Sequence, residues 1–142
     1  MPDLSADRAG AVVQDIVSLS ALLARLEAAG LSPTLATIGR PEAGVVIDRW
    51  LADSIDALVQ PMIAITCLFD PDAVLIGGRL PMPVITRLAA GLSERLTKAR
   101  LPVHTPILLA TMAQDAPAMG AAILPFLAHL LPSDAILIQA GR

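Results

Sequence analysis

Apolar side chains recur every three to four residues in the first part of the chain, the spacing of one helix face. The stripe consists of Ile16, Leu19, Leu22, Leu23 and Leu26. Ser18 or Ser20 is suited to cap this helix at its start, and Gly30 is placed to end it. Residues 1–14 show no such pattern and are expected to form a loose arm.

A longer helix is expected next, because Pro41-Glu42 suits a first helical turn. Its apolar stripe comprises Ile47, Leu51, Ile55, Leu58, Met62, Ile65 and Phe69. Polar residues lie opposite this stripe at first, but the run 61–69 is apolar on every side and predicts a fully buried segment. Pro61 predicts a kink or the start of a new segment, and Asp70-Pro71 is expected to close the element.

Two short apolar runs, 73–76 and 105–110, have the pattern of parallel strands that are buried on both faces. Between them, Pro81 and Pro83 are expected to open a helix. The residues of this helix that are expected to face inward are Ile85, Leu88, Leu92 and Leu96.

The end of the chain predicts one more helix. It is expected to begin at Asp115 and Pro117, to contain the small residues Gly120 to Ala122, and to bend at Pro125. Residues 134–139 predict a third short strand or a tail, and 133–142 lie beyond the last helix.

This order of elements predicts an α/β fold, because helices alternate with strands in the second half of the chain. The strand–helix–strand unit at 73–110 predicts parallel strands joined by a right-handed crossover. Two or three strands make a small sheet, and strands buried on both faces usually have more neighbours. The pattern therefore indicates that part of the sheet comes from elsewhere.

Composition points in the same direction. The chain has 142 residues, of which 55% are hydrophobic, 16% charged and 2% aromatic. Such a composition excludes disorder, and its low charge indicates a surface that something else covers. The net charge of −3 excludes a basic footprint for nucleic acid.

Targeting and metal chemistry are not indicated by the sequence. Cys67 is the single cysteine, so an internal disulfide is excluded, and with two histidines it makes no ordinary zinc site. The polar N-terminus is not a signal peptide, and the longest charge-free stretch, 116–133, contains three prolines and a histidine, which disfavours a membrane span. A cytoplasmic protein that does not contact a membrane is expected.

The sharpest local motif is FDPDAVLIGGRLP, residues 69–81. Gly77 and Gly78 follow the first strand, where glycines let a ligand approach the backbone at the carboxyl edge of a parallel sheet. The same two glycines also serve a tight strand-to-helix turn without any ligand, and they lack the GxGxxG context of a dinucleotide site.

Together with TPILLAT (105–111) and QDAPAMGAAILPF (114–126), this motif resembles the C-terminal part of the ROK family. The family groups bacterial sugar kinases with sugar-responsive transcriptional repressors. The segment DIVSLSALLARLEAAG (15–30) resembles the helix that follows the family's zinc-binding region, so that the resemblance covers about 15–132. It implies part of the second lobe of an actin-like (ribonuclease H-like) ATPase fold, with 1–142 as a single lobe fragment.

The departures from the family pattern are as informative as the likeness. The sequence has no DxGxT phosphate loop, no Asn-Asp pair, no ExGH motif and no cysteine-rich zinc motif. Phosphoryl transfer needs positioned phosphates, a metal and a base, so no catalytic residue is assigned and catalysis by this chain alone is not expected. Gly77 and Gly78 match the family's glycine turn near the nucleotide, and Arg79 replaces its third glycine.

Other polar and aromatic residues are given structural interpretations. Trp50 is expected in a core or interface and Cys67 in the interior as an inert thiol. His104 is expected to fill a structural role in a strand, and His129 to lie on the solvent side of the last helix. The basic residues Arg95, Lys98 and Arg100 are expected to complement a helix dipole.

Three hypotheses for function remain open. The first is the C-terminal fragment of a ROK-type sugar-sensing regulator, without catalysis and without cofactor or metal of its own. The second is the C-terminal lobe of an ATP-dependent hexose kinase, where ATP and sugar bind only through the complete protein. The third is an oligomerisation module without ligand. A homo-oligomer, or association with a missing N-terminal lobe, is expected, because open strand edges need cover.

Overall fold

The computed structural model describes residues 12–99, 105–110 and 116–130. The chain divides into two compact units between Ala110 and Thr111. The described elements are α1 (Val13–Val17), α2 (Leu19–Ala28), α3 (Leu35–Ile38), the 3-10 helix η2 (Pro41–Ala43), α4 (Gly44–Phe69), β1 (Val74–Ile76), α5 (Met82–Lys98), β2 (Ile107–Leu109) and α6 (Ala116–Leu130). The protein is therefore helix-rich, with one small parallel sheet, and the expected α/β class is confirmed.

Two short helices, α1 and α2, stand where one was expected. Ser18 separates them, and its hydroxyl accepts a hydrogen bond from the Ala21 backbone N–H at 3.2 Å, which caps α2 as predicted. Gly30 follows the end of α2 with φ +76, a conformation that glycine adopts without strain. The four-residue α3 had no counterpart in the hydrophobic pattern, which is too short there to show a period.

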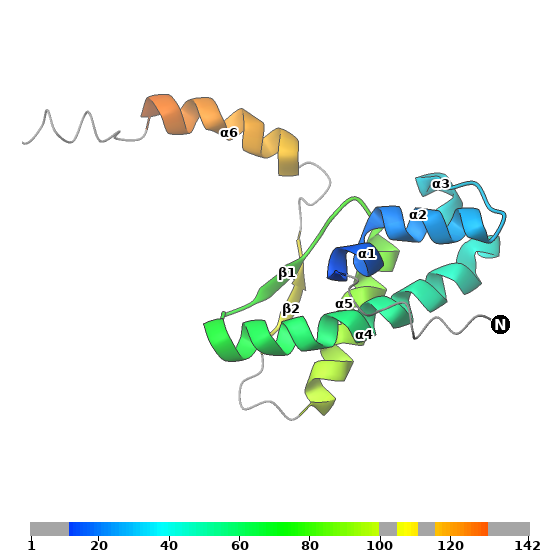
Figure 1. The fold of residues 1–142 in the computed structure, drawn as a ribbon. Coiled ribbons are helices and arrows are strands. Elements are labelled where there is room, and N and C mark those ends of the chain that lie inside the picture. The colour runs from blue at the N-terminus through cyan, green and yellow to red at the C-terminus, as the bar shows by residue number, and fades with distance from the viewer. Residues whose placement is uncertain (1–11, 100–104, 111–115, 131–142) are drawn as a thin grey trace, which may run out of the picture. The chain divides into compact units, whose positions relative to one another are not determined.

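The long helix α4 organises the first unit (Figure 1). It begins after the 3-10 turn at Pro41 and runs without interruption through Pro61, so the prediction of a new segment at Pro61 is wrong. It ends at Asp70, which has a left-handed φ of 43 and precedes Pro71, as predicted.

The core of the first unit lies where α4 meets α2 and α5. Its largest fully buried side chain is Trp50, whose indole N–H donates to the Ile16 carbonyl oxygen at 2.8 Å, and the predicted core position is confirmed. The buried cluster comprises Leu22, Leu26, Ile38, Ala43, Ile47, Trp50, Leu51, Val84, Leu88 and Leu92.

The expected helix after the glycine turn is confirmed as α5. Its predicted inward residues Ile85, Leu88, Leu92 and Leu96 are all buried. Gly91 lies against Ile55 of α4, and a Cβ at position 91 would collide with the Ile55 Cδ1 atom. The two helices therefore approach each other closely at this glycine.

The sheet consists of β1 and β2, paired in parallel with Leu75 opposite Leu108. Ile76 and Ile107 pack against the core, but Leu75 and Leu108 are 66% and 48% exposed. The prediction that both strands are buried on both faces is therefore wrong for the described structure. The reason is that side chains alternate between faces, and only one face is packed against the core.

The last turns of α4 also depart from expectation. Leu68 and Phe69 are each 76% exposed, and Cys67 is exposed. The predictions of a fully buried segment 61–69 and of a buried Cys67 thiol are therefore wrong. Within this segment Met62 and Thr66 alone are buried, because one side of the helix faces the rest of the unit.

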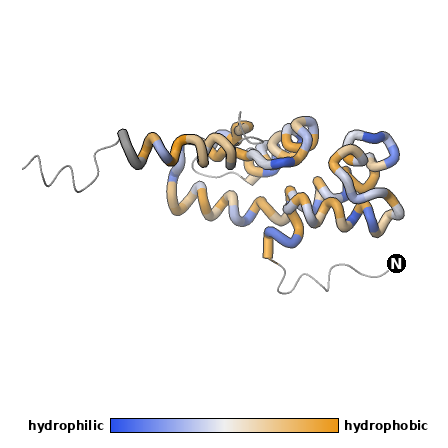
Figure 2. The backbone as a smooth tube through the Cα atoms, turned by 90° about the horizontal axis from the view of Figure 1, so that it is seen from above, coloured by the Kyte–Doolittle hydropathy of each residue, from blue (hydrophilic) through white to orange (hydrophobic). Residues whose placement is uncertain are grey.

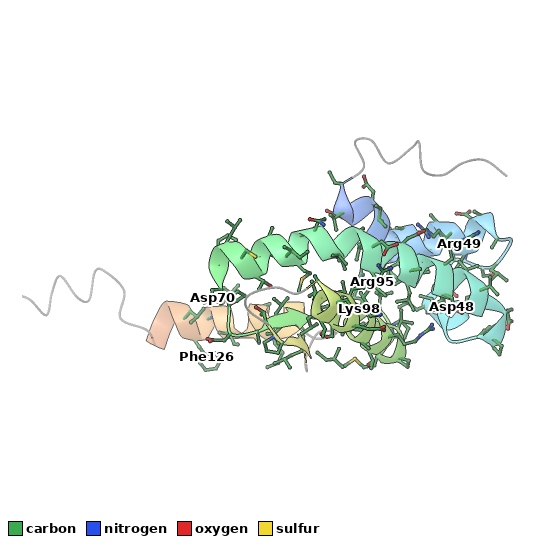
Figure 3. The ribbon with its side chains drawn as sticks, turned by 90° about the horizontal axis from the view of Figure 1, so that it is seen from below. Asp48, Arg49, Asp70, Arg95, Lys98 and Phe126 are labelled. Atoms are coloured by element: carbon green, nitrogen blue, oxygen red, sulfur yellow. The ribbon has the colours of Figure 1, made fainter. Side chains whose placement is uncertain are left out.

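The second unit contains α6, which runs through Pro125. Residues 118–127 are all exposed, and the larger apolar ones are Met119, Ile123, Leu124, Phe126 and Leu127. Figure 2 shows this helix as largely hydrophobic along its length, and Phe126 projects from it (Figure 3). The expected strand or tail at 134–139 and the arm at 1–11 lie outside the described residues.

Candidate functional site

The glycine turn between β1 and α5 is the candidate site that the sequence singled out. β1 ends at Ile76, Gly77 and Gly78 follow, and α5 begins at Met82. Gly78 has φ +147, which L side chains rarely adopt, while a Cβ there would meet no atom within 4 Å. The glycine at position 78 is therefore required by its backbone conformation and leaves open space beside the chain.

This turn lies at the carboxyl edge of the parallel sheet. Ile76 is in register with Leu109, and the Ala110 N–H donates to the Ile76 carbonyl oxygen at 2.9 Å. Both strands therefore end at the same edge, the place where α/β folds bind ligands. Asp115, which was expected at the start of the last helix, lies outside the described residues.

The residue after the two glycines is Arg79, and its side chain is exposed. It makes no ion pair with any described residue. A guanidinium beside exposed backbone N–H groups suits an anionic or hydroxylated ligand, and it replaces the glycine that the resemblance would lead one to expect. Metal binding has no support in the described part of the chain, where no three His, Cys, Asp or Glu residues gather.

The aspartates on the polar side of α4 pair with arginines from other helices. Arg87 and Arg95 of α5 donate to Asp48 and Asp56, each at 2.7 Å. Figure 3 places Asp48 on α4 and Arg95 on α5. In both pairs the arginine follows the aspartate by 39 residues, so α4 and α5 run in the same direction with matched turns.

Sequence reasoning missed these pairs, although a signal was present. Two aspartates eight residues apart, and two arginines eight residues apart, place like charges on one face of each helix. A third pair joins Arg25 of α2 to Asp53, also at 2.7 Å, with both side chains about one-third exposed or less. These three ion pairs connect neighbouring helices and do not form a ligand site.

The basic residues at the end of α5 are likewise structural. Lys98 donates to Glu94 one turn earlier at 2.6 Å, and this hydrogen bond together with the lysine's charge lowers the pKa of the Glu94 carboxyl. Arg95 belongs to the pair with Asp56. Arg100 and His104 lie outside the described residues, as does the side chain of His129.

One described helical stretch, Pro41–Phe69, is long and apolar enough to cross a membrane by length and composition alone. The same stretch contains the buried Trp50 and Leu51, which pack in the core of the first unit. Core helices of globular proteins pass this criterion as well, so it does not assign the helix to a membrane.

A scan against models of protein families finds no match for this chain, and a search of curated proteins finds none either.

Proposed function

We propose that the chain is the C-terminal portion of a ROK-type, sugar-responsive transcriptional regulator and that it has no catalysis of its own. In this proposal it forms part of the second lobe of an actin-like fold. The observation that supports the proposal most is the unit β1–Gly77–Gly78–α5–β2, a parallel pair whose glycine turn stands at the carboxyl edge of the sheet. The resembling motif of residues 69–81 contains β1 and the glycine turn of this unit, and the motif of residues 105–111 contains β2.

The regulator is favoured over the kinase because of the residue that follows the two glycines of the turn. Arg79 occupies the position of the third glycine and brings a charged side chain to the edge where a nucleotide would approach. The sequence also offers no phosphate loop, ExGH motif or Asn-Asp pair, so neither candidate gives this chain catalysis of its own. Sugar recognition and DNA binding would then depend on parts of the complete protein outside this chain.

The kinase lobe remains the second candidate, on one observation. Gly78 combines a positive φ with free space around its Cα, which is what close approach of a ligand to the backbone requires. In that case the chain would contribute the adenosine side of an ATP site that the other lobe completes.

The first measurement tests whether this chain alone binds a ligand. Isothermal titration of the full chain with Mg-ATP and with a panel of hexoses is expected to show no saturable heat. Saturable ATP binding that is lost in Gly78→Val and retained in an exposed-site control, Val45→Ala, would overturn the regulator proposal in favour of the kinase lobe.

The second measurement is the coding sequence directly upstream of Met1. A helix-turn-helix in the same reading frame would support the regulator, and DxGxT and ExGH motifs would support the kinase. A transcript that starts at Met1, together with no ligand binding, would contradict both and leave an oligomerisation module.

A further inference from the structure

Among the described residues, one edge of the strand β1 has no partner strand. The Val74 N–H donates to the Pro106 carbonyl oxygen, and the Ala110 N–H donates to the Ile76 carbonyl oxygen, each at 2.9 Å. The backbone groups of residues 74 and 76 therefore point toward β2. Because these groups alternate in direction along a strand, the N–H and C=O of Leu75 point away from β2, and β2 is the single neighbour of β1 in the described sheet (Figure 1).

The same strand presents an apolar side chain on the open face of the sheet. Leu75 is 66% exposed and stands opposite Leu108, which is 48% exposed. The opposite face of the sheet packs on the core through Ile76 and Ile107. An open edge next to exposed leucines is the arrangement that proteins normally cover or block.

Opposite charges flank the two ends of β1. Asp70 and Asp72 precede the strand, Arg79 follows it, and all three are exposed. None of the three makes an ion pair among the residues that the structure describes. A strand that is negative at its start and positive after its end is complementary to a second copy of itself running the other way.

We propose that the free edge of β1 pairs with the same edge of a second copy of this chain, antiparallel and around a two-fold axis. In the register centred on Leu75, this residue faces Leu75 of the second copy, and the two exchange both of their N–H···O=C bonds. Ala73 then faces Gly77 of the second copy. A continuous sheet of four strands results, in the order β2, β1, β1, β2.

This register satisfies the charges and the apolar face together. Asp70 and Asp72 precede the paired strand and Arg79 follows it, so the antiparallel arrangement places each Arg79 at the same end of the sheet as Asp70 and Asp72 of the second copy. Leu108 and Leu75 of each copy form one row of four leucines on the open face. The glycines at 77 and 78 place no side chain in the path of the approaching strand.

The edge of β2 is a weaker choice for the same partner. The described residues next to it, Thr105, Pro106 and Ala110, carry no charge. Leu108, whose backbone groups point toward β1, is also less exposed than Leu75. The complementary charges therefore assign the contact to β1.

The proposal is tested on the full chain by light scattering after size exclusion, over a range of micromolar concentrations. The expected mass is twice the 14.7 kDa of one chain. Leu75→Lys places two lysines directly opposite each other and is expected to raise the dissociation constant at least about tenfold. The matched control Val45→Lys, at an 81% exposed site at the start of α4, is expected to leave the dissociation constant unchanged.

Charge variants test the register without changing the strand itself. Arg79→Glu is expected to weaken the dimer, because the new carboxylate faces Asp70 and Asp72. The double variant D72R/R79E is expected to restore it. Circular dichroism confirms that each variant is folded, and these exposed positions remain informative if Leu75→Lys does not fold.

A cross-link gives the geometry directly. In a Cys67→Ser background, Leu75→Cys is expected to form an intermolecular disulfide on mild oxidation, since residues paired in this way have Cα atoms about 5.5 Å apart. Leu108→Cys in the same background is expected to react far more slowly. A monomer at all concentrations, or a dimer that neither Leu75→Lys nor Arg79→Glu weakens, would overturn the proposal. No sugar or nucleotide enters these measurements, so their failure is distinct from failure of the proposed function.

Discussion

The two ends of α4 both carry large apolar side chains, but their surroundings are opposite. Around Trp50 and Leu51, the helix is enclosed by α1, α2 and α5, and both side chains are buried. Around Leu68 and Phe69, the helix is apolar but three-quarters exposed. This difference shows that an apolar sequence does not by itself make a segment buried. The segment is buried only where a neighbouring element packs against it.

Charges mark the solvent side at one end of α4 and are missing at the other. Asp48, Asp53 and Asp56 alternate with the buried stripe and pair with arginines of α5 and α2. The run from Pro61 to Phe69 has no charged residue, so its sides cannot be distinguished by sequence. Substitutions of buried and exposed side chains measure how much the two ends differ in their contribution to stability.

Replacement of Trp50 by alanine is expected to cost about 3–5 kcal/mol of unfolding free energy, because it empties the fully buried centre of the first unit. It also removes the donor to the Ile16 carbonyl oxygen. Urea denaturation followed by circular dichroism measures the loss. Leu68→Ala, at a 76% exposed site, is the control and is expected to cost less than about 0.5 kcal/mol.

If Leu68→Ala cost as much as Trp50→Ala, the contrast between the two ends of α4 would be wrong. Trp50→Phe separates packing from hydrogen bonding. It retains most of the ring and is expected to lose about 1–3 kcal/mol, since it leaves the Ile16 carbonyl without its donor.

Gly91→Ala is expected to destabilise the first unit by about 1–2 kcal/mol, because the new methyl group meets the Ile55 side chain, including Cγ1 at 3.3 Å. The intrinsic helix preference for alanine, about 1 kcal/mol, is expected to offset part of the clash. In an Ile55→Val background, which lacks the Cδ1 atom, the same substitution is expected to be neutral or stabilising. Equal costs in both backgrounds would contradict a close contact between α4 and α5 at this point.

Ser54→Ala is expected to stabilise the protein by about 1 kcal/mol. Its hydroxyl oxygen is fully buried in the enclosed half of α4 and has no hydrogen-bond partner in the described structure. Thermal unfolding monitored by circular dichroism measures the change as a rise in Tm. Ser93→Ala on α5, at a partly exposed position, provides the comparison and is expected to change Tm little.

The smallest expected effect concerns Glu94 and Lys98 at the exposed end of α5. Lys98 lowers the folded-state pKa of Glu94 below its ordinary value of 4.5, so the pair stabilises the protein above that value. The contribution is lost as the pH falls through the lowered pKa. A carboxyl titration by NMR checks this, and Lys98→Ala is expected to raise the Glu94 pKa toward its ordinary value. An unchanged pKa in that variant would contradict the pairing.

Much of the element order was predictable because strong local signals mark it. Ser18 precedes α2, Gly30 follows it, and Asp70 follows the last residue of α4. The alternation of helices with strands predicted a parallel pair, and β1 and β2 confirm it. The tight turn at Gly77 and Gly78 was also expected from the sequence, and Gly78 has a positive φ that glycine adopts without strain. Ligand binding at this turn stays a prediction. The pairing of Asp48 and Asp56 with arginines 39 residues later was not predicted, because it depends on the relative direction of two helices.

By itself, the sequence determined the order of the longer helices and of the two strands and several of their ends. It also determined that the chain is rich in apolar and poor in charged side chains. Local conformation is set by a few neighbouring residues, so pattern and capping residues are sufficient for it. The tertiary structure alone decided that Leu68, Phe69, Leu75 and Leu108 are exposed. Burial is a relation between distant segments, and an apolar run reads the same in the sequence whether or not another element covers it.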